Sequence, residues 1–566
     1  GAEALLLTAD LAKEKKDSAG ELAALLQLWG KHPLSTLSEP AEARIKGIKK
    51  GSITPEATIW RAEALIDSHR NKQGMALLAP LLPLLKLPDP LACKAHFLNG
   101  KALRKERKHS QAVTSLVPVV TKCTDPDLRA RAMYVLGSSQ SIVDLDRGAK
   151  TYEGLAHEFP THSFADDALF YAADLYVKLG ELDAAMKTLT ELAEKYPGGD
   201  FAAVALFKRF WIQRERGQTD EAVKTLELLR KSYREAEESY EYERATYWLG
   251  RMHEKSDPKA AVALFQEVAV DHPATYYGLI ARDRIAALDN DAFNKLGQKL
   301  AFPEAGAPVW PLFAGPLGDD PHFRAGVELY RLGLTEAVTS ELLAANRTNQ
   351  PPEAVRLLVQ ILSLSGDARS AHAVARVSLR RDLSGRISPE NRFVWEVAYP
   401  RAFRDSIEEH CKSAGFDPDL LQALMREESA LDPKALSWAG ALGLTQLMPS
   451  TAIQVAHSLK LKTPSTAALL EPALNIRLGA SYLGTLLKQW KGNKQYALGS
   501  YNAGAKAVQK WRDDNPKLEL DEWVEEIPIA ETRGYVKRVL RSYNTYQLLY
   551  PTRPPVKTAS NSAERK

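Results

Sequence analysis

The sequence predicts an all-α protein with two parts, a long superhelix of helical hairpins and a smaller helical domain after it. Apolar residues recur at helical spacing over residues 1 to about 290, with short polar breaks and almost no strand-like alternation. A pattern of about 37 residues repeats along the same stretch, which is typical of stacked hairpins. Residues 401–550 add further helical periodicity, interrupted by glycine-containing loops.

The composition is that of a folded protein. Of the 566 residues, 45% are hydrophobic and 26% are charged, which excludes wholesale disorder. The net charge of +4 gives no support for nucleic-acid binding, although it would not repel an anionic polymer. No run of about 18 apolar residues is present, so we expect no transmembrane segment. The chain opens at Gly1 without a charged and apolar leader, as a processed or trimmed chain would.

The repeat in residues 1–290 is marked by an alanine that follows a turn. It recurs every 36 to 39 residues, at Ala76, Ala112, Ala149, Ala185, Ala222 and Ala261. A small residue lets two helices approach closely, and a glycine such as Gly180 or Gly217 caps one of them. Because one hairpin cannot bury its apolar face alone, successive hairpins should stack into a curved superhelix resembling tetratricopeptide-type repeats.

Beyond the superhelix we expect three further segments. The stretch 288–321 opens with Asp-Asn-Asp-Ala and then has the Pro and Gly content of a linker, while Trp310, Leu312 and Phe313 indicate that part of it packs on a neighbour. Helical periodicity returns over 322–382, with a break between hairpins at Gly366-Asp367. We therefore place the superhelix at 1–290, a linker and helical linker domain at 291–400, a helical domain at 401–550 and a disordered tail at 551–566.

The three cysteines, Cys93, Cys123 and Cys411, lack metal-ligand spacing. Cys93 and Cys123 could pair in an oxidising compartment, but we expect three buried thiols. The cysteines alone therefore do not assign a compartment.

A candidate catalytic acid lies in the stretch from Met425 to Pro449. A helix start at Asp417-Pro418 is followed by apolar residues at helical spacing, and Glu428 continues that apolar face. Burial disfavours a charged carboxyl, so we expect Glu428 to have a raised pKa, as a general acid needs. Glu427 is rotated by about 100° and is expected to be solvated. The alternative is a buried, hydrogen-bonded glutamate with a structural role.

Three more clusters supply hydroxyl, amide and carboxyl groups, namely residues 475–483, 500–504 and 527–536. Taken singly, Gly504 can be a helix cap, Tyr501 a packed aromatic residue and Glu531 a carboxylate at a helix start. Together with a protonated acid, these groups could bind a sugar chain and cleave its glycosidic bond. No metal-ligand cluster, phosphate-binding loop or Ser-His-Asp set is apparent, so we expect no metal and no cofactor.

These clusters also carry a family resemblance. The pair Glu428-Ser429, the segment 440–452 (GALGLTQLMPSTA), Ser-Tyr-Asn-Ala-Gly at 500–504 and residues 527–536 (IPIAETRGYV) resemble the four signatures of soluble lytic murein transglycosylases. The resemblance covers roughly 150 residues in matching order and spacing. It implies a lysozyme-like catalytic domain at 401–550, joined to a superhelix that can close into a ring.

The resemblance also implies roles for individual residues. Glu428 is similar in position to the single catalytic acid/base of the family. Six residues fall where the family lines its glycan cleft: Ser437, Gln446, Met448, Tyr501, Asn502 and Glu531. Thr445 departs from the usual Met, and Ser500 departs from the usual Ala, two small changes expected near the cleft.

The activity implied is cleavage of the β-1,4 bond between N-acetylmuramic acid and N-acetylglucosamine in peptidoglycan, leaving 1,6-anhydro-muramoyl ends. Two alternatives remain open: a lysozyme-type muramidase, which hydrolyses the same bond, and a non-catalytic peptidoglycan-binding scaffold. The resemblance implies a periplasmic monomer whose partners are glycan strands, with no nucleic acid, and whose superhelix can contact other cell-wall enzymes.

Overall fold

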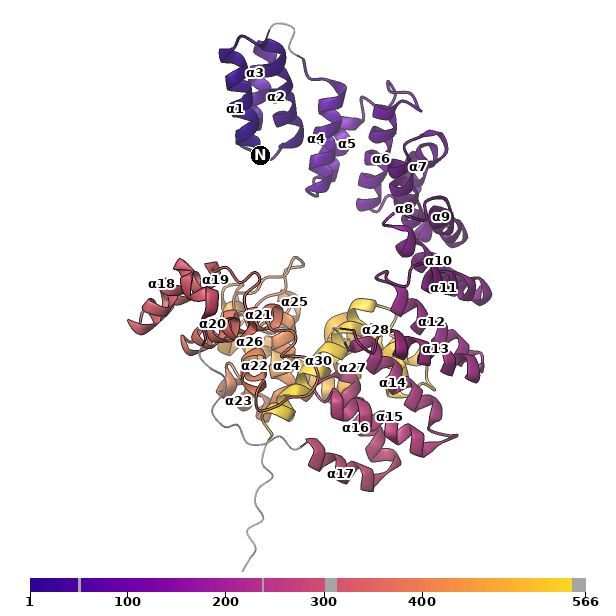
Figure 1. Ribbon diagram of the computed structural model, residues 1–566, viewed down its shortest axis with the longest axis vertical. Coiled ribbons are helices and arrows are strands. Elements are labelled where there is room, and N and C mark those ends of the chain that lie inside the picture. The colour runs from indigo at the N-terminus through magenta and orange to yellow at the C-terminus, as the bar shows by residue number, and fades with distance from the viewer. Residues whose placement is uncertain (49–51, 237–238, 301–312, 552–566) are drawn as a thin grey trace, which may run out of the picture. The chain divides into compact units, whose positions relative to one another are not determined.

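The computed structural model describes residues 1–48, 52–236, 239–300 and 313–551 (Figure 1). Across these ranges β-type pairing is confined to two isolated bridges, Leu436 with Leu442 and Leu442 with Leu447. The predicted all-α class is confirmed. The chain forms two compact units, residues 1–229 and 230–566.

The first unit is a succession of helical hairpins, in which most helices pack against a neighbour in sequence (Figure 1). Short polar turns separate the helices, as the sequence predicts. The helices are α1 (Ala2–Glu14), α2 (Ser18–Lys31), α3 (Ser38–Gly47), α4 (Pro55–Asp67), α5 (Asn71–Leu78), α6 (Pro90–Lys105), α7 (His109–Lys122), α8 (Pro126–Val143), α9 (Leu145–Glu158), α10 (Ala165–Leu179), α11 (Leu182–Lys195), α12 (Ala202–Glu215) and α13 (Thr219–Ser232).

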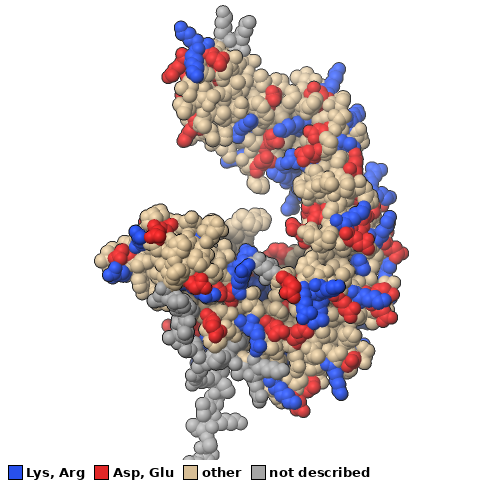
Figure 2. Space-filling model, in the orientation of Figure 1, with Lys and Arg blue, Asp and Glu red and all other residues tan. Residues whose placement is uncertain are grey.

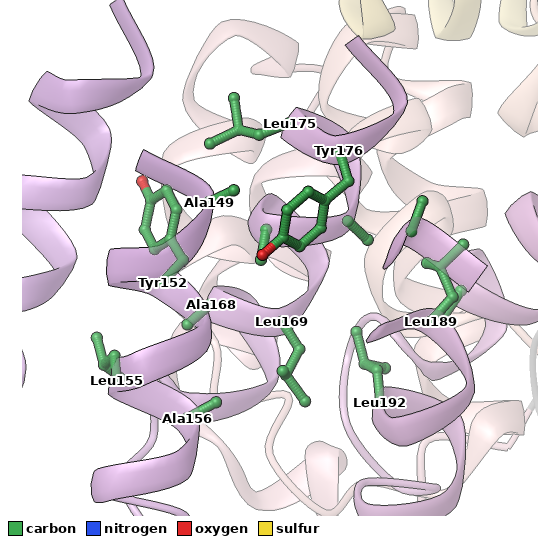
Figure 3. Packing of buried hydrophobic residues seen from close by; sticks show 14 of the residues in the cluster. Ala149, Tyr152, Leu155, Ala156, Ala168, Leu169, Leu175, Tyr176, Leu189 and Leu192 are labelled. Atoms are coloured by element: carbon green, nitrogen blue, oxygen red, sulfur yellow. The ribbon is translucent and has the colours of Figure 1, made fainter. Parts of the chain in front are cut away.

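The hairpins share an apolar core that runs between consecutive pairs. Figure 3 shows this core at α9, α10 and α11, where Tyr152, Leu155, Leu169, Leu189 and Leu192 meet. All five side chains are buried, and small alanines fill the space between the helices. The core is therefore continuous from one hairpin to the next, which is the packing expected of a repeat array.

The alanine of the repeat is fully buried at five of its six positions, namely Ala112, Ala149, Ala185, Ala222 and Ala261. Ala76 is exposed, so the prediction is wrong there. In that hairpin Gly74 makes the close approach, because a Cβ at this position would lie 2.5 Å from Cγ1 of Ile66. Gly180 and Gly217 have φ of +77° and +71°, as predicted for caps that need the left-handed region.

Cys93 and Cys123 form a disulfide, with Cα atoms 6.0 Å apart. The expectation of three thiols is therefore wrong for this pair. Cys93 lies near the start of α6 and Cys123 follows the end of α7, so the hairpin brings the two residues together. Cys411 is a buried free thiol.

The second unit begins with hairpin helices and continues into the helical domain. Its first helices are α14 (Tyr240–His253), α15 (Pro258–Asp271), α16 (Tyr276–Leu288), α17 (Asn290–Leu300), η1 (Gly315–Asp319), α18 (Pro321–Arg331), α19 (Thr335–Ala344), α20 (Pro352–Leu364) and α21 (Ala368–Ser378). They are followed by α22 (Arg392–Ala398), α23 (Arg404–Ala414), α24 (Pro418–Ser429), α25 (Pro449–Ser458), η2 (Ala468–Leu470), α26 (Pro472–Gln489), α27 (Lys494–Ala503), α28 (Ala505–Asp514), α29 (Leu520–Glu525) and α30 (Ala530–Leu549).

The linker prediction is wrong over residues 290–300. Residues 290–300 form α17 rather than linker, because Asp289 accepts a hydrogen bond from the backbone of Ala292 and caps a helix. Phe313 is half exposed. Trp310 and Leu312 lie outside the described residues, as does the predicted tail after residue 551. The helices α18 to α21 confirm the periodicity predicted for 322–382.

Within the second unit, α29 and α30 contact the hairpin helices α14 and α16 through buried charges. Asp521 of α29 pairs with Arg251 at 2.8 Å and with Arg284 at 3.0 Å. Lys537 of α30 pairs with Glu525 at 2.7 Å, and the hydroxyl of Tyr277 donates to the same carboxylate at 2.8 Å. Each buried charge thus has a partner of opposite sign, which offsets the cost of its desolvation. The predicted domain limits at 290 and 400 stay predictions.

Positive and negative side chains are interspersed on the face that Figure 2 shows, without a broad area of one sign. This pattern matches the small net charge of +4. No helix in the described ranges has the length and apolar character needed to cross a membrane.

Candidate functional site: a half-buried carboxyl between two helices

Helix α24 carries Glu428 near its C-terminal end. The side chain of Asp417 accepts a hydrogen bond from the backbone of Asp419 at 2.9 Å, and Pro418 occupies the first turn, as predicted. The helix ends at Ser429, and Ala430 follows with φ +49°. Leu424 and Met425 are fully buried, so the apolar face predicted for this helix is confirmed.

Glu428 is half-buried and has one hydrogen-bond donor on α30. The hydroxyl of Tyr535 donates to its Oε1 at 2.7 Å. Burial raises the pKa of Glu428 to about 7, and the negative charge of Glu531 acts in the same direction. The Tyr535 hydrogen bond and the charge of Arg538 oppose this shift. The carboxyl can therefore hold a proton near neutral pH, as a general acid requires.

Glu427 is buried, which corrects the prediction that it is solvated. Its side chain is only 4% exposed and pairs with the guanidinium of Arg426 at 2.5 Å. Ser542 of α30 donates to it at 2.6 Å. Burial alone would raise the pKa of Glu427, but Arg426, Arg541 and the Ser542 hydrogen bond hold it below its usual range. The pKa values of the two neighbouring glutamates are thus shifted in opposite directions.

The loop after α24 is tied to the helix that precedes it. The hydroxyl of Ser429 donates to the carbonyl of Leu444 at 2.8 Å. Asn475 of α26 accepts from the backbone of Thr445 at 2.8 Å and donates to the carbonyl of Leu442 at 3.0 Å. Gly443 has φ +74°, and a Cβ there would lie 2.4 Å from the Asn475 amide nitrogen, so its close approach is to Asn475.

Both departures from the family pattern face the interior. Thr445 is fully buried, donates from its hydroxyl to Asn475 at 2.7 Å and packs on Gly479. Ser500 is also fully buried and accepts the indole N–H of Trp490 at 2.8 Å. Their side chains therefore pack inside the domain.

The structure brings together only some of the predicted cleft residues. Tyr501 donates to the carbonyl of Thr445 at 2.8 Å, next to the loop that Ser429 holds. Asn502 donates to Glu531 at 3.4 Å and accepts from Thr532 at 2.6 Å. Glu531 lies in the first turn of α30, one turn before Tyr535, and is 63% exposed.

The other three predicted residues belong to the loop. Ser437 accepts the backbone N–H of Ala441 at 2.9 Å, and Gln446 donates to the carbonyl of Gly443 at 2.8 Å. Met448 precedes α25 and is 41% exposed. None of the three is hydrogen-bonded to Glu428 in the described part of the chain.

Two residues beside Glu428 were missed by sequence reasoning, namely Tyr535 and Arg538. They follow Glu531 on α30 by four and seven residues, so one face of the helix carries all three side chains. Helical spacing from Glu531 was the signal that could have found them. No group of three or more His, Cys, Asp and Glu side chains that could hold a metal ion exists among the residues that the structure describes.

The chain thus combines a series of helical hairpins with a helical domain in which the half-buried Glu428 carboxyl has a pKa raised to about 7. Residues 405–524 match the family model described as Transglycosylase SLT domain. Residues 167–199 and 204–236 match tetratricopeptide repeats.

Two of the relatives are described as soluble lytic murein transglycosylases. That of Escherichia coli K12 is 33% identical over 175 residues, which is 30% of this chain and 27% of the relative. A protein of Haemophilus influenzae described as a putative soluble lytic murein transglycosylase is 38% identical over 151 residues, 26% of each chain. The match thus spans about a quarter of the length of these relatives.

Solved structures share the fold over nearly the whole chain. The lytic transglycosylase Slt of Pseudomonas aeruginosa superposes with a TM-score of 0.61 at 22% identity, covering 96% of this chain and 80% of that one. The 70-kDa soluble lytic transglycosylase of Escherichia coli gives 0.60 at 19% identity, covering 99% and 82%. The predicted fold, a helical-hairpin superhelix followed by a lysozyme-like helical domain, is confirmed.

Proposed function

We propose that this protein is a peptidoglycan lytic transglycosylase with Glu428 as its acid/base. The observation that carries the proposal is the half-buried Glu428 carboxyl, hydrogen-bonded to Tyr535 at 2.7 Å and with a pKa raised to about 7. A group with this pKa can give a proton and take it back at neutral pH. The SLT domain match supports the same assignment.

In the first step, protonated Glu428 donates to the glycosidic oxygen between N-acetylmuramic acid and N-acetylglucosamine. The oxocarbenium-like centre that forms needs a second carboxylate or a group of the substrate. Glu427 pairs with Arg426 and Asp432 pairs with Arg369 at 3.0 Å, and Glu531 is assigned to contact with the substrate. The substrate's own 2-acetamido group therefore stabilises the centre.

In the second step, ionised Glu428 takes the proton from the C6 hydroxyl of the muramoyl residue. The oxygen attacks C1 and closes the 1,6-anhydro ring, so the bond is cleaved without consuming water. The hydrogen bond from Tyr535 stabilises the carboxylate in this interval. Ser437, Gln446, Met448, Tyr501, Asn502 and Glu531 are proposed to line the glycan cleft around it.

The protein is further proposed to act in the periplasm as a monomer, with the superhelix available to other cell-wall enzymes. The disulfide between Cys93 and Cys123 supports an oxidising compartment. The proposed substrate also lies there.

The test is mass spectrometry of the soluble products released from purified peptidoglycan. We expect products that end in 1,6-anhydro-muramoyl groups, each lighter by one water than the product of hydrolysis. Glu428→Gln should reduce their formation by at least about 10²-fold, the contribution typical of a general acid. Glu409→Gln, at an exposed position of α23, serves as the matched control and should retain the wild-type rate.

Other outcomes would contradict the proposal. Reducing-end products would make the protein a muramidase. No products, with binding to peptidoglycan retained, would make it a scaffold. Substantial residual turnover in Glu428→Gln would remove this residue from its role.

A further inference from the structure

One face of α30 borders the Glu428 carboxyl along three helical turns. Glu531, Tyr535, Arg538 and Ser542 are spaced by four, three and four residues, which places them in one stripe. Tyr535 bonds to Glu428, and Ser542 bonds to the neighbouring Glu427. Arg538 lies between these two contacts, so its guanidinium belongs to the immediate surroundings of the proposed acid.

Arg538 has hydrogen-bonding capacity that the described residues do not use. Its Nε lies 3.8 Å from Glu427, and its Nη2 lies 3.9 Å from Glu531. Both separations are longer than a hydrogen bond, and in the described part of the chain the side chain makes none. The side chain is 45% exposed. By contrast, Arg533 on the same helix donates to the carbonyls of Glu525 and Ile527.

The position of this cation is not explained by the pKa of the acid. Burial raises the pKa of Glu428, whereas the charge of Arg538 lowers it. The step in which Glu428 donates its proton gains nothing from a neighbouring positive charge. The two flanking carboxylates hold the guanidinium in place from a distance and leave its planar donor edge free for a third carboxylate.

We propose that Arg538 binds a carboxylate of the muramoyl residue whose glycosidic bond is cleaved. The proposal rests on the proposed function, which places that residue at Glu428. The muramoyl residue differs from N-acetylglucosamine by a lactyl group that ends in a carboxyl, or in a stem peptide that carries carboxylates. Arg538 lies one helical turn from Tyr535, within reach of such a substituent. It thereby distinguishes muramoyl residues from neutral sugars.

Binding of this carboxylate has a consequence for the acid. A substrate carboxylate on Arg538 neutralises the cation that lowers the pKa of Glu428. Substrates with the acidic substituent thus favour the protonated acid in the complex. Neutral analogues leave the positive charge uncompensated.

The test compares Arg538→Gln with wild type on soluble glycan strands that carry stem peptides, and on the same strands stripped of peptides, which expose the lactyl carboxyl. Each substrate is also used after its carboxyls have been converted to amides. We expect Arg538→Gln to lower kcat/KM by about tenfold or more on carboxylate substrates, the effect of losing a charged hydrogen bond. On amidated strands the two proteins should have equal kcat/KM, and Arg538→Lys should recover only part of the loss.

The substrate arms identify the source of the carboxylate. A loss confined to peptide-bearing strands assigns it to the stem peptide, and a loss on stripped strands assigns it to the lactyl group. Arg477→Gln, at an exposed arginine of α26, is the control for removal of a positive charge and should match wild type. Equal thermal unfolding of all variants excludes misfolding as the cause.

Two results would overturn the proposal: an equal loss on native and amidated strands, or no loss on any strand. If wild type released no anhydro products, the proposed function would fail separately. Affinity would then decide the role of Arg538, because Glu428→Gln with and without Arg538→Gln can be titrated with native and amidated strands. Equal affinities of the two proteins for native strands would refute carboxylate binding.

Discussion

At the scale of single residues, the two adjacent glutamates of α24 have opposite environments. Glu428 has a raised pKa and Glu427 has a lowered one. Glu428 can therefore hold a proton near neutral pH, and Glu427 keeps its negative charge next to Arg426. Three predictions follow from this difference.

The pH dependence of turnover should report the Glu428 proton. The rate is expected to fall as pH rises through about 7, because the acid form is lost. In Tyr535→Phe the hydrogen bond that stabilises the carboxylate is absent, so the pKa rises and the alkaline fall should move to higher pH. Rate profiles of the two proteins, normalised to their maxima, provide the measurement. An unchanged or lower alkaline midpoint in Tyr535→Phe would contradict this assignment.

Glu428 should also reduce the stability of the fold at alkaline pH. Its folded pKa of about 7 exceeds the ordinary value of 4.5, so the folded state binds the extra proton and loses stability as pH rises between these values. Glu428→Gln should thus be more stable than wild type at pH 8 by about 2 kcal/mol, a figure discounted for partial exposure. At pH 4 the two should be equal. Urea unfolding at both pH values measures the difference, and equal stability at pH 8 would refute the raised pKa.

Glu427→Gln should act in the opposite direction. It leaves the buried Arg426 guanidinium without its nearest countercharge, a change that typically costs about 3–5 kcal/mol of unfolding free energy. Urea unfolding at pH 7 checks this, with the exposed Glu409→Gln as reference. A loss below about 1 kcal/mol would mean that the buried Arg426 does not depend on this carboxylate.

The sequence predicted the raised pKa of Glu428 because the apolar face of α24 is regular. It failed at Glu427 because α24 is covered on more than one side, and buried polar residues such as Gln422 and Arg426 break the amphipathic pattern. In a sequence, the charged residues of a buried ion pair cannot be told apart from those of a solvent-exposed helix face. Ser542 and Arg541, which interact with Glu427, lie more than a hundred residues away on α30. The residue spacing in α30 does not show which of its faces packs against α24.

At the scale of elements, Asn475 joins α26 to the loop that follows α24. Its amide makes four hydrogen bonds to that loop and to the carbonyl of Leu469. Asn475→Ala should lower the unfolding free energy by about 3 kcal/mol, because buried groups lose their partners. Thr445→Val removes one of these bonds and should cost about 1 kcal/mol. If Asn475→Ala lost no more unfolding free energy than Thr445→Val, the other hydrogen bonds of this amide would not stabilise the loop.

Element boundaries were predictable where periodicity was long and were missed where composition misled. The helices α18 to α21 follow the predicted period, whereas α17 was read as linker from its Asp and Asn residues. Those residues include the cap that starts α17, since Asp289 accepts from Ala292. The same residue types serve caps and loops, so only the three-dimensional position of the backbone separates the two.

At the scale of the whole molecule, the disulfide closes a loop of 30 residues in the first unit. Its reduction should lower the unfolding free energy of this unit by about 3–4 kcal/mol. Urea unfolding with and without reductant measures the change, and a Cys93→Ala/Cys123→Ala variant should be insensitive to reductant. Unchanged unfolding of the wild type under reduction would contradict a stabilising role. The spacing of the cysteines allowed the pair but did not require it, because register between α6 and α7 decides their distance.

The buried charges between α29, α30 and the hairpin helices limit how this chain can be divided. Asp521 depends on Arg251 and Arg284, and the Glu525 carboxylate that pairs with Lys537 also accepts from Tyr277. A fragment cut to the SLT match at 405–524 would keep Asp521 and discard its partners, and it would also lack α30 with Tyr535. A chimaera or a split protein should therefore keep residues 230–551 together, so that these buried charges retain their partners.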